Sequence, residues 1–297
     1  MKGHRDSLLL EDAEVLAHDA YEGAQHILRV NAPRIAARAR AGSFAHITCG
    51  PRLPMRRPLS IMRVDAHDGW LEFLYKVVGD GTGELSRRRV GEVVSVLGPI
   101  GRPFMASPER PRPLLLGGGV GIPPMVFLAD ELRTARRYRP LVIMGSEVPF
   151  PFRPWHSRLE VTGMPDGVDT GMPLLEDWGV PSRLASLQGY AGCHQGYVTD
   201  LARLWLDALD DAERGEVEIF GCGPHPMLEA VARVAAEYRL PCQVSLEEFM
   251  ACAVGGCAGC TVEVLTDQGP AMKRVCVDGP VFEARAVFPD LFPGAGA

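Results

Sequence analysis

Cys252-Ala-Val-Gly-Gly-Cys257-Ala-Gly-Cys260, followed by Cys276, is the stretch that decides how this chain is organised. It holds four of the eight cysteines, spaced C-x4-C-x2-C, with fifteen residues between the third cysteine and the fourth. Plant-type [2Fe–2S] sites use this spacing, and their four thiolates hold two irons. The intervening glycines would let the loop fold tightly around a cluster, because glycine adopts positive φ without a Cβ clash. The spacing therefore predicts an iron–sulfur site.

A structural zinc site and disulfides are the alternatives for these cysteines. Structural zinc also takes four thiolates, but usually from two C-x2-C pairs, and this stretch has one such pair. Disulfides belong mainly to secreted proteins, and residues 1–6 have no apolar segment typical of a secretory signal. The pattern favours a cytoplasmic iron–sulfur protein, which would carry one electron at a time.

The composition limits the remaining classes of function. The chain has 297 residues, enough for two domains and a small module. Hydrophobic residues make up 46% and charged residues 23%, which is typical of a globular protein. The net charge of −6 gives no electrostatic support for nucleic-acid binding. No run of 18 apolar residues occurs, so we expect no membrane span.

Residues 1–108 read as a small antiparallel β-barrel. Apolar and polar residues alternate in 14–18, 24–30 and 70–78, and turn residues separate these runs. Several short strands at this spacing predict a barrel, with one short helix over 83–89.

Residues 109–241 read as a parallel α/β domain. A short apolar strand at 112–116 runs into Gly117–Pro124, and a helix is expected over 125–138. Strand, glycine turn and helix form the layout of a dinucleotide site, although the spacing is not G-x-G-x-x-G. Glu147 follows the next strand and would favour NAD over NADP, because a carboxylate repels a 2′-phosphate.

The rest of the chain is predicted in less detail. Between 149 and 190 we expect strand pieces near Val161, Val168 and 184–187, and a helical turn over 173–178. Residues 242–297 should form a cluster module with strands at 261–265 and 273–280 and a frayed end at 293–297.

Taken singly, the other motifs are ambiguous. Arg57 and Ser60 could serve a phosphate and a polar ring edge, or could simply end a strand. The glycines of 79–83 could offer N–H groups to phosphate or only form a turn. Cys222, between two glycines after a strand, lies where ligands bind in α/β sheets, but a small buried residue is an equal reading. Three cysteines without a metal-binding spacing are read as structural: Cys49, Cys193 and Cys242.

The order of these motifs resembles the ferredoxin–NADP reductase superfamily, in which FAD lies on a six-stranded barrel and a nicotinamide nucleotide on a following α/β domain. With a cluster after the nucleotide domain, the chain resembles the electron-transfer subunits of type B dihydroorotate dehydrogenases. The resembling segments are 57–60, 75–82, 97–101, 117–124, 221–227, 247–252 and 274–280. The last two are specific to these subunits, and residues 149–195 depart from the family pattern.

The resemblance implies three cofactors: FAD, a [2Fe–2S] cluster and NAD. Arg57 would hold the FAD pyrophosphate, and Ser60 would lie at the isoalloxazine as a catalytic residue. The other implied FAD-binding residues are Pro58, Leu59, Tyr75, Lys76, Val77, Gly81 and Thr82. Cys222 would be a second catalytic residue at the nicotinamide. The implied NAD-binding residues are Gly117, Gly118, Gly119, Gly121, Gly221, Gly223 and Pro224. Cys252, Cys257, Cys260 and Cys276 would ligate the cluster.

The implied function is electron transfer in pyrimidine biosynthesis. Electrons would pass from dihydroorotate to FMN in a partner catalytic subunit, then through the cluster to FAD, and as hydride to NAD+. The expected assembly is a heterotetramer of two plus two subunits. One alternative is an NAD(P)H-dependent reductase serving an oxygenase, a sulfide or sulfite system, or ferredoxin. Another is a redox-sensing or assembly module with a structural cluster, which the intact glycine turn and Arg57 argue against.

Overall fold

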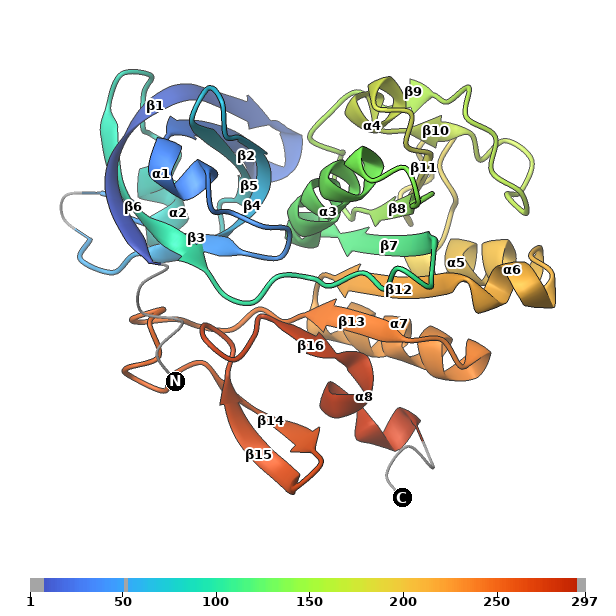
Figure 1. Ribbon diagram of the computed structural model, residues 1–297. Helices are drawn as coiled ribbons and strands as arrows, with labels where there is room; N and C mark the ends of the chain where they lie inside the picture. The colour runs from blue at the N-terminus through green and yellow to red at the C-terminus, as the bar shows by residue number, and fades with distance from the viewer. Residues whose placement is uncertain (1–7, 51–52, 293–297) are drawn as a thin grey trace.

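The computed structural model describes residues 8–50 and 53–292, and its N-terminal third is a closed antiparallel barrel. The barrel order is β1-β2-β5-β4-β3-β6 (Figure 1). Its strands are β1 Leu9–Tyr21, β2 Gln25–Asn31, β3 Phe44–Ile47, β4 Arg57–Asp65, β5 Trp70–Lys76 and β6 Val93–Ile100. Alternating side chains such as Val15, Leu28 and Phe73 fill its interior and are fully buried. The barrel predicted from residues 1–108 is confirmed. Two expectations concern residues outside the described ranges: that residues 1–6 are not a secretory signal, and that residues 293–297 form a frayed end.

Short helices close the turns of the barrel: η1 Glu22–Ala24, α1 Pro33–Ala36 and α2 Asp80–Leu85. The helix expected over 83–89 therefore begins and ends earlier. The reason is local, because Thr82 Oγ1 accepts hydrogen bonds from the N–H groups of Val78 (3.0 Å) and Gly79 (3.4 Å). These bonds start the helix ahead of Gly83.

The second domain contains a six-stranded sheet in the order β11-β8-β7-β12-β13-β16. Neighbours are parallel except β16, which is antiparallel to β13. Its strands are β7 Arg112–Gly118, β8 Leu141–Gly145, β11 Ser182–Ala185, β12 Val217–Cys222, β13 Cys242–Ser245 and β16 Val281–Glu283. Its helices are η2 Gly119–Gly121, α3 Ile122–Thr134, α5 Val198–Asp207, α6 Asp211–Gly215 and α7 His225–Tyr238. The strand order reverses between β7 and β12, which is where doubly wound sheets bind nucleotides.

The irregular segment after β8 forms a small lobe with a two-stranded sheet, β9 Trp155–His156 and β10 Thr170–Gly171, and the helix α4 Pro173–Asp177. The helical turn at 173–178 and the strand near 184 are confirmed. Strand pieces at Val161 and Val168 were a wrong expectation, because neither residue is in a strand. Gly163 and Gly167 between them have positive φ, so the chain turns where a strand would run straight.

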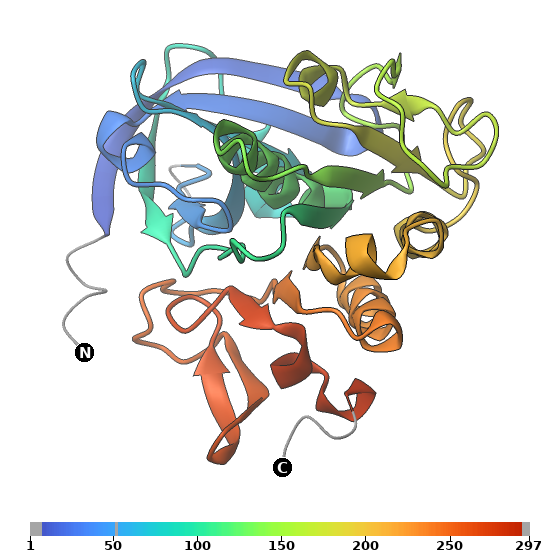
Figure 2. The same cartoon turned by 45° about the vertical axis from the view of Figure 1, so that its right-hand side comes forward.

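The C-terminal module lies beneath the barrel and the α/β domain in both views (Figures 1 and 2). It consists of the cysteine loop, the hairpin β14 Thr261–Thr266 with β15 Gly269–Arg274, and the helices α8 Ala284–Val287 and η3 Pro289–Leu291. Both β13 and β16 extend the parallel sheet, so the domain boundary drawn at residue 241 falls inside that sheet. No helix among the described residues is long and apolar enough to cross a bilayer.

Cation–π contacts between arginine and tryptophan side chains connect the barrel to the second domain. Arg63 on β4 lies 5.2 Å from the ring centre of Trp70 and 5.8 Å from that of Trp178. Arg133 on α3 lies 4.5 Å from the Trp178 ring. Glu72, only 5% exposed, accepts hydrogen bonds from Arg63 at 3.3 Å and from Arg29 at 2.7 Å. Trp178 therefore receives one cation from each domain.

Replacing Trp178 by alanine should destabilise the protein by about 2 kcal/mol, because two cation–π contacts and a half-buried ring are lost. Equilibrium unfolding in urea measures this change. Trp155→Ala is the matched control, because its ring is 55% exposed, and it should change the unfolding free energy little. Equal losses of unfolding free energy in the two variants would contradict a stabilising role for the cation–π contacts of Trp178.

Candidate functional site

The four predicted cluster ligands come together in the C-terminal module. Cys252 interacts with Cys257, and Cys276 interacts with both Cys260 and Cys252. Cys260 and Cys276 are buried, whereas Cys257 is exposed. The loop turns through residues of positive φ, including Ala253, Gly255 and Ala258. The cysteine spacing thus brings four thiols to one place, with one edge of the set open to solvent.

The surroundings of these thiols suit a metal-bound thiolate. The N–H of Cys257 donates to Cys252 Sγ at 3.4 Å, and the N–H of Gly259 donates to Cys257 Sγ at 3.4 Å. Burial opposes ionisation of Cys252, but hydrogen bonds led by the N–H groups of Val254 and Cys257 lower its pKa to about 7. Such N–H···S bonds favour the anionic ligand and tune cluster potentials.

Hydrogen bonds also hold the loop in shape. Arg274 Nη1 donates to the Gly255 carbonyl at 3.0 Å, and Asp278 accepts from the Arg274 N–H at 2.9 Å. Gly255 has φ +80°, and a Cβ there would lie 3.1 Å from the side chain of Val277. The backbone and its hydrogen bonds therefore define the conformation of the loop, and the donor set fits a four-thiolate cluster.

The predicted flavin residues lie where β4 leaves β5. Residues 57–60 pair with β3, whereas β4 pairs with β5 only from Ile61 onward. Residues 74–76, the last of β5, pair with β2 on one side, and no residue of β4 pairs with them on the other. The two segments that sequence reasoning assigned to FAD therefore flank the same opening in the sheet. Ser60, on β4, is half-buried at this opening.

Arg57 and Gly81 lie together at the predicted phosphate end of this opening. A Cβ at Gly81 would lie 2.4 Å from Arg57 Nε, so the guanidinium rests directly on the helix backbone. Arg57 Nη1 also donates to the carbonyls of Met55 (3.1 Å) and Arg56 (3.2 Å). The Thr82 hydroxyl is already engaged with the turn before α2. The positive charge at this end comes from Arg57, whose planar fork suits a pyrophosphate.

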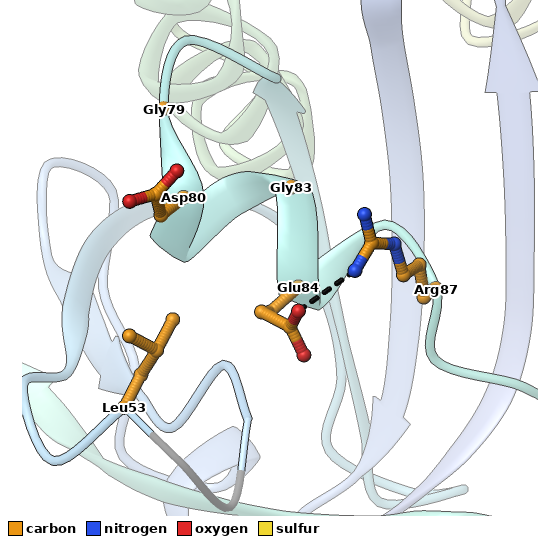
Figure 3. A pocket seen from close by; sticks show the side chains of 6 residues that line it. All are labelled: Leu53, Gly79, Asp80, Gly83, Glu84 and Arg87. Atoms are coloured by element: carbon orange, nitrogen blue, oxygen red, sulfur yellow. Dashed lines mark hydrogen bonds and ion pairs between the residues drawn. The ribbon is translucent and has the colours of Figure 1, made fainter.

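A cavity of about 300 Å³ opens beside this phosphate end. Figure 3 shows Leu53 on one side and the α2 residues on the other, with Glu84 paired to Arg87 at 2.8 Å. The lining residues are Leu53, Gly79, Asp80, Gly83, Glu84 and Arg87. This cavity could receive the nucleotide end of FAD.

Not every predicted flavin residue presents its side chain to this opening. Tyr75 is 1% exposed, and its ring stacks on that of His26 with the two ring centres 5.3 Å apart. The Tyr75 hydroxyl forms a hydrogen bond with His18 Nε2 at 2.8 Å. Val77 donates its N–H to Ala24 at 2.8 Å. Leu59 is buried, whereas Pro58 and Lys76 are half-buried. Tyr75 is thus held within the barrel by two histidines.

The glycine turn after β7 meets the turn after β12. A Cβ at Gly121 would lie 2.2 Å from the Cys222 carbonyl oxygen, and one at Gly118 would lie 2.3 Å from Met227 Sδ. Gly117 pairs with Cys222 across the parallel strands. The backbone can approach a ligand closely here, because no Cβ fills the turn. Gly119 (φ +55°) has open space beside it, whereas Gly221, Gly223 and Pro224 shape the turn into α7.

Cys222 lies at the carboxyl end of β12 and is 8% exposed. Burial raises the pKa of its thiol to about 12, against a hydrogen bond with Ser245 that lowers it. The thiol is therefore neutral at pH 7 and is not a nucleophile. Its side chain is small, neutral and polarizable, so the predicted place beside a nicotinamide would suit it as a packing surface.

Sequence reasoning did not single out Tyr197. Its ring is 62% exposed and comes just before Val198, whose side chain would lie 2.8 Å from a Cβ at Gly145. An exposed aromatic ring at the carboxyl end of β8 is a suitable platform for an adenine. The Asp200 carboxylate accepts the Tyr197 N–H at 2.8 Å and holds this corner in place. The only signal in the sequence for this residue was that an aromatic side chain precedes the capping residues at the start of α5.

Solved structures confirm the class of fold. The NADH-dependent reduced ferredoxin–NADP oxidoreductase, a flavin-based electron-bifurcating enzyme, aligns over 98% of this chain and 93% of its own chain, with a TM-score of 0.74 and 24% identity. The ferredoxin reductase of carbazole 1,9a-dioxygenase aligns over 79% of this chain and 67% of its own, with a TM-score of 0.60 and 20% identity. The chain therefore has the ferredoxin reductase fold, here extended by a four-cysteine module.

Sequence relatives define the family more closely. Residues 247–288 match the iron–sulfur cluster binding domain of dihydroorotate dehydrogenase B, and this range contains all four ligand cysteines. The dihydroorotate dehydrogenase B (NAD+) electron transfer subunit of Caldanaerobacter subterraneus subsp. tengcongensis is 33% identical, over 83% of this chain and 86% of its own. That of Bacillus caldolyticus is 30% identical over 95% and 98%. The chain belongs to the family of dihydroorotate dehydrogenase B (NAD+) electron transfer subunits.

Gly81→Ala should weaken FAD binding about tenfold or more, because the new methyl group would displace the Arg57 guanidinium. Titration of the apoprotein with FAD, followed by quenching of flavin fluorescence, gives the dissociation constant. Gly215→Ala, in α6 of the second domain, is the control, because no atom would lie within 4 Å of its Cβ. Unchanged FAD affinity in Gly81→Ala would contradict the assignment of Arg57 to the pyrophosphate.

Proposed function

We propose that this chain carries electrons from a partner dihydroorotate dehydrogenase to NAD+, using a [2Fe–2S] cluster and FAD. The observation that carries the proposal is the four-thiol loop, which packs against both the flavin barrel and the nucleotide domain. Cys260 and Cys276 share one hydrophobic cluster with Phe44 and Ile100 of the barrel and with Val244 of β13. A one-electron carrier thus lies in the same packed unit as the sites for two two-electron carriers.

The order of transfer follows from the chemistry of the cofactors. The cluster takes one electron at a time, nicotinamide accepts only hydride, and a flavin converts one mode into the other. FAD at the opening between β4 and β5 would stand between the cluster loop and the nucleotide turns at Gly117–Gly121 and Cys222. Arg57 would hold its pyrophosphate, and Ser60 would lie at its ring. The exposed Cys257 edge would face the electron donor.

The partner in this proposal is a catalytic subunit that oxidises dihydroorotate with bound FMN, in pyrimidine biosynthesis. Relatives that match 83% and 95% of this chain are named as electron transfer subunits of dihydroorotate dehydrogenase B (NAD+). An assembly of two catalytic and two electron-transfer subunits is part of the proposal. The exposed side chains of Phe249 (94%) and Val254 (46%) beside the cysteine loop would suit a protein surface there.

Dihydroorotate should bleach the flavin and cluster absorption of this protein only after the FMN-containing catalytic subunit is added. NADH alone should bleach the flavin, because hydride transfer needs no partner. Anaerobic absorption spectroscopy follows both changes. Bleaching by NADH without any response to dihydroorotate and the partner would favour a reductase serving another acceptor. A protein whose flavin responds to neither would overturn the electron-transfer role.

Cys257→Ser should abolish the [2Fe–2S] absorption while NADH still reduces bound FAD, because the exposed ligand is lost and the hydride path is untouched. Absorption and EPR spectra measure the cluster, and stopped-flow absorbance measures flavin reduction. Cys193→Ser, at a half-buried thiol outside the cluster loop, should keep both signals. If the Cys257 variant also lost NADH-driven flavin reduction, the proposed order of cofactors would be wrong.

A further inference from the structure

His46 on β3 is a buried imidazole that the function described so far does not use. The residue is 1% exposed, and neither ring nitrogen has a hydrogen-bond partner among the described residues. The backbone of Arg56 lies close enough to the ring to raise its pKa, but it does not meet the geometry of a hydrogen bond. Buried polar side-chain groups normally have partners, so an exception calls for an explanation.

The strand register places His46 on the flavin side of the barrel wall. His46 pairs with Pro58, and Phe44 pairs with Ser60. Directly paired residues share a face of the sheet, and residues two apart along a strand share it too. The four side chains therefore lie on one face, and Ser60 and His46 are diagonal neighbours. Such neighbours are separated by about 7–8 Å between Cα atoms, a gap that one water molecule can bridge.

The same face is turned toward the cluster module. Phe44 packs in one hydrophobic cluster with Cys260, Cys276 and Ala253 of that module. Leu97 on β6 pairs with His46 on β3, and it also packs against this cluster. The imidazole thus lies on the same face of the barrel wall as Ser60 and Phe44, and Phe44 belongs to the hydrophobic cluster that also includes side chains of the cysteine module.

The charges that face His46 come from the segment leading into β4. Burial, then the charge of Arg56, and more weakly that of Arg57, lower the pKa of His46 to about 4. The imidazole is therefore neutral at pH 7 in the apoprotein. A bound pyrophosphate at Arg57 would offset the smallest of these contributions and raise the pKa of His46, against burial and the charge of Arg56, which continue to lower it. The neighbours on β6, Ser95 and Leu97, carry no charge.

Proton balance requires such a group, given the proposed function on which this inference rests. Electrons that arrive through the cluster carry no proton. The hydride that leaves the flavin for NAD+ carries two electrons and one proton. For each pair of electrons, one proton must therefore enter the flavin site from the protein, and solvent must replace it. When NADH reduces the flavin in the reverse direction, the hydride brings that proton with it, so no protein donor is needed.

We propose that His46 relays this proton to the flavin site, through the Ser60 hydroxyl and a bridging water. One N–H bond of the imidazolium breaks and one bond to the flavin ring forms, while the two electrons come from the cluster. The imidazole then regains a proton from solvent. His46 acts through Ser60 and does not itself touch the reacting atoms.

The wild-type protein with both cofactors bound gives the first test. Flavin reduction is followed by stopped-flow absorbance in H₂O and D₂O, with photoreduced methyl viologen as the one-electron donor and NADH as the hydride donor. Loading through the cluster should slow in D₂O and with rising pH, whereas reduction by NADH should show neither effect. The absence of a solvent isotope effect on loading would overturn the proposal. Failure of both donors to reduce the flavin would instead overturn the proposed function.

His46→Asn gives the second test, because asparagine can hydrogen-bond but cannot carry a proton at neutral pH. Loading by methyl viologen should slow about a hundredfold and recover with added imidazole, while NADH reduction should keep its rate. His67→Asn, at an exposed turn, is the control and should change neither rate. Equal slowing of both donors would show a structural defect in place of a relay, and no slowing would exclude His46.

A readout without turnover covers the case in which the asparagine variant does not fold. Histidine NMR of the cluster-free Cys257→Ser protein reports the pKa of His46 with and without FAD. The pKa should rise when FAD binds, because the pyrophosphate compensates Arg57. An imidazole whose pKa stays near 4 with FAD bound could not hold a proton at neutral pH, and the relay would be wrong.

Discussion

The change of partner along β4 is the constraint on which the rest of the structure depends. Residues 57–60 bond to β3 and residues 61–65 to β5, so the wall of the barrel opens beside 74–76. A closed barrel normally satisfies its backbone groups within its own ladders, and an opening of this kind suits a bound group. Arg57 lies at one end of the opening and Ser60 at the other. The same register sets Phe44 and His46 on the face that the cluster module covers.

The orientation of the two larger domains is fixed by polar contacts as well as by apolar packing. The Trp178 ring receives Arg63 from the barrel and Arg133 from α3. On another side, the Gln25 amide donates to the Pro149 carbonyl at 2.7 Å, and a Cβ at Gly23 would lie 2.7 Å from Val148 Cβ. Hydride transfer needs donor and acceptor within contact distance, so contacts that hold the domains in register serve the chemistry indirectly. The sheet strand β16 fixes the cluster module in the same way.

Several features could be predicted because their signals are local. The glycine turn after β7 and the alternation in each barrel strand lie within about a dozen residues and the four cysteines within 25, and each was found where expected. Features that depend on contacts between distant residues could not be predicted. Val161 and Val168 looked like strand pieces, but the chain turns at Gly163, where a Cβ would lie 2.5 Å from the Cβ of the distant Ala208. The sheet crosses the boundary drawn at residue 241, because β16 returns from beyond the cluster loop.

The sequence by itself determined the class of chemistry: four thiols at an iron–sulfur spacing, after a barrel and a glycine turn. Those signals are short-range, since ligand spacing and turn geometry depend on neighbouring residues. Only the tertiary structure decided which residues share a face. The buried Tyr75 ring contacts two half-buried histidines, His18 and His26, which the sequence did not predict, and His46 drew no notice in the sequence. Strand register, a long-range property, places His46 beside Ser60 and leaves its nitrogens unpaired.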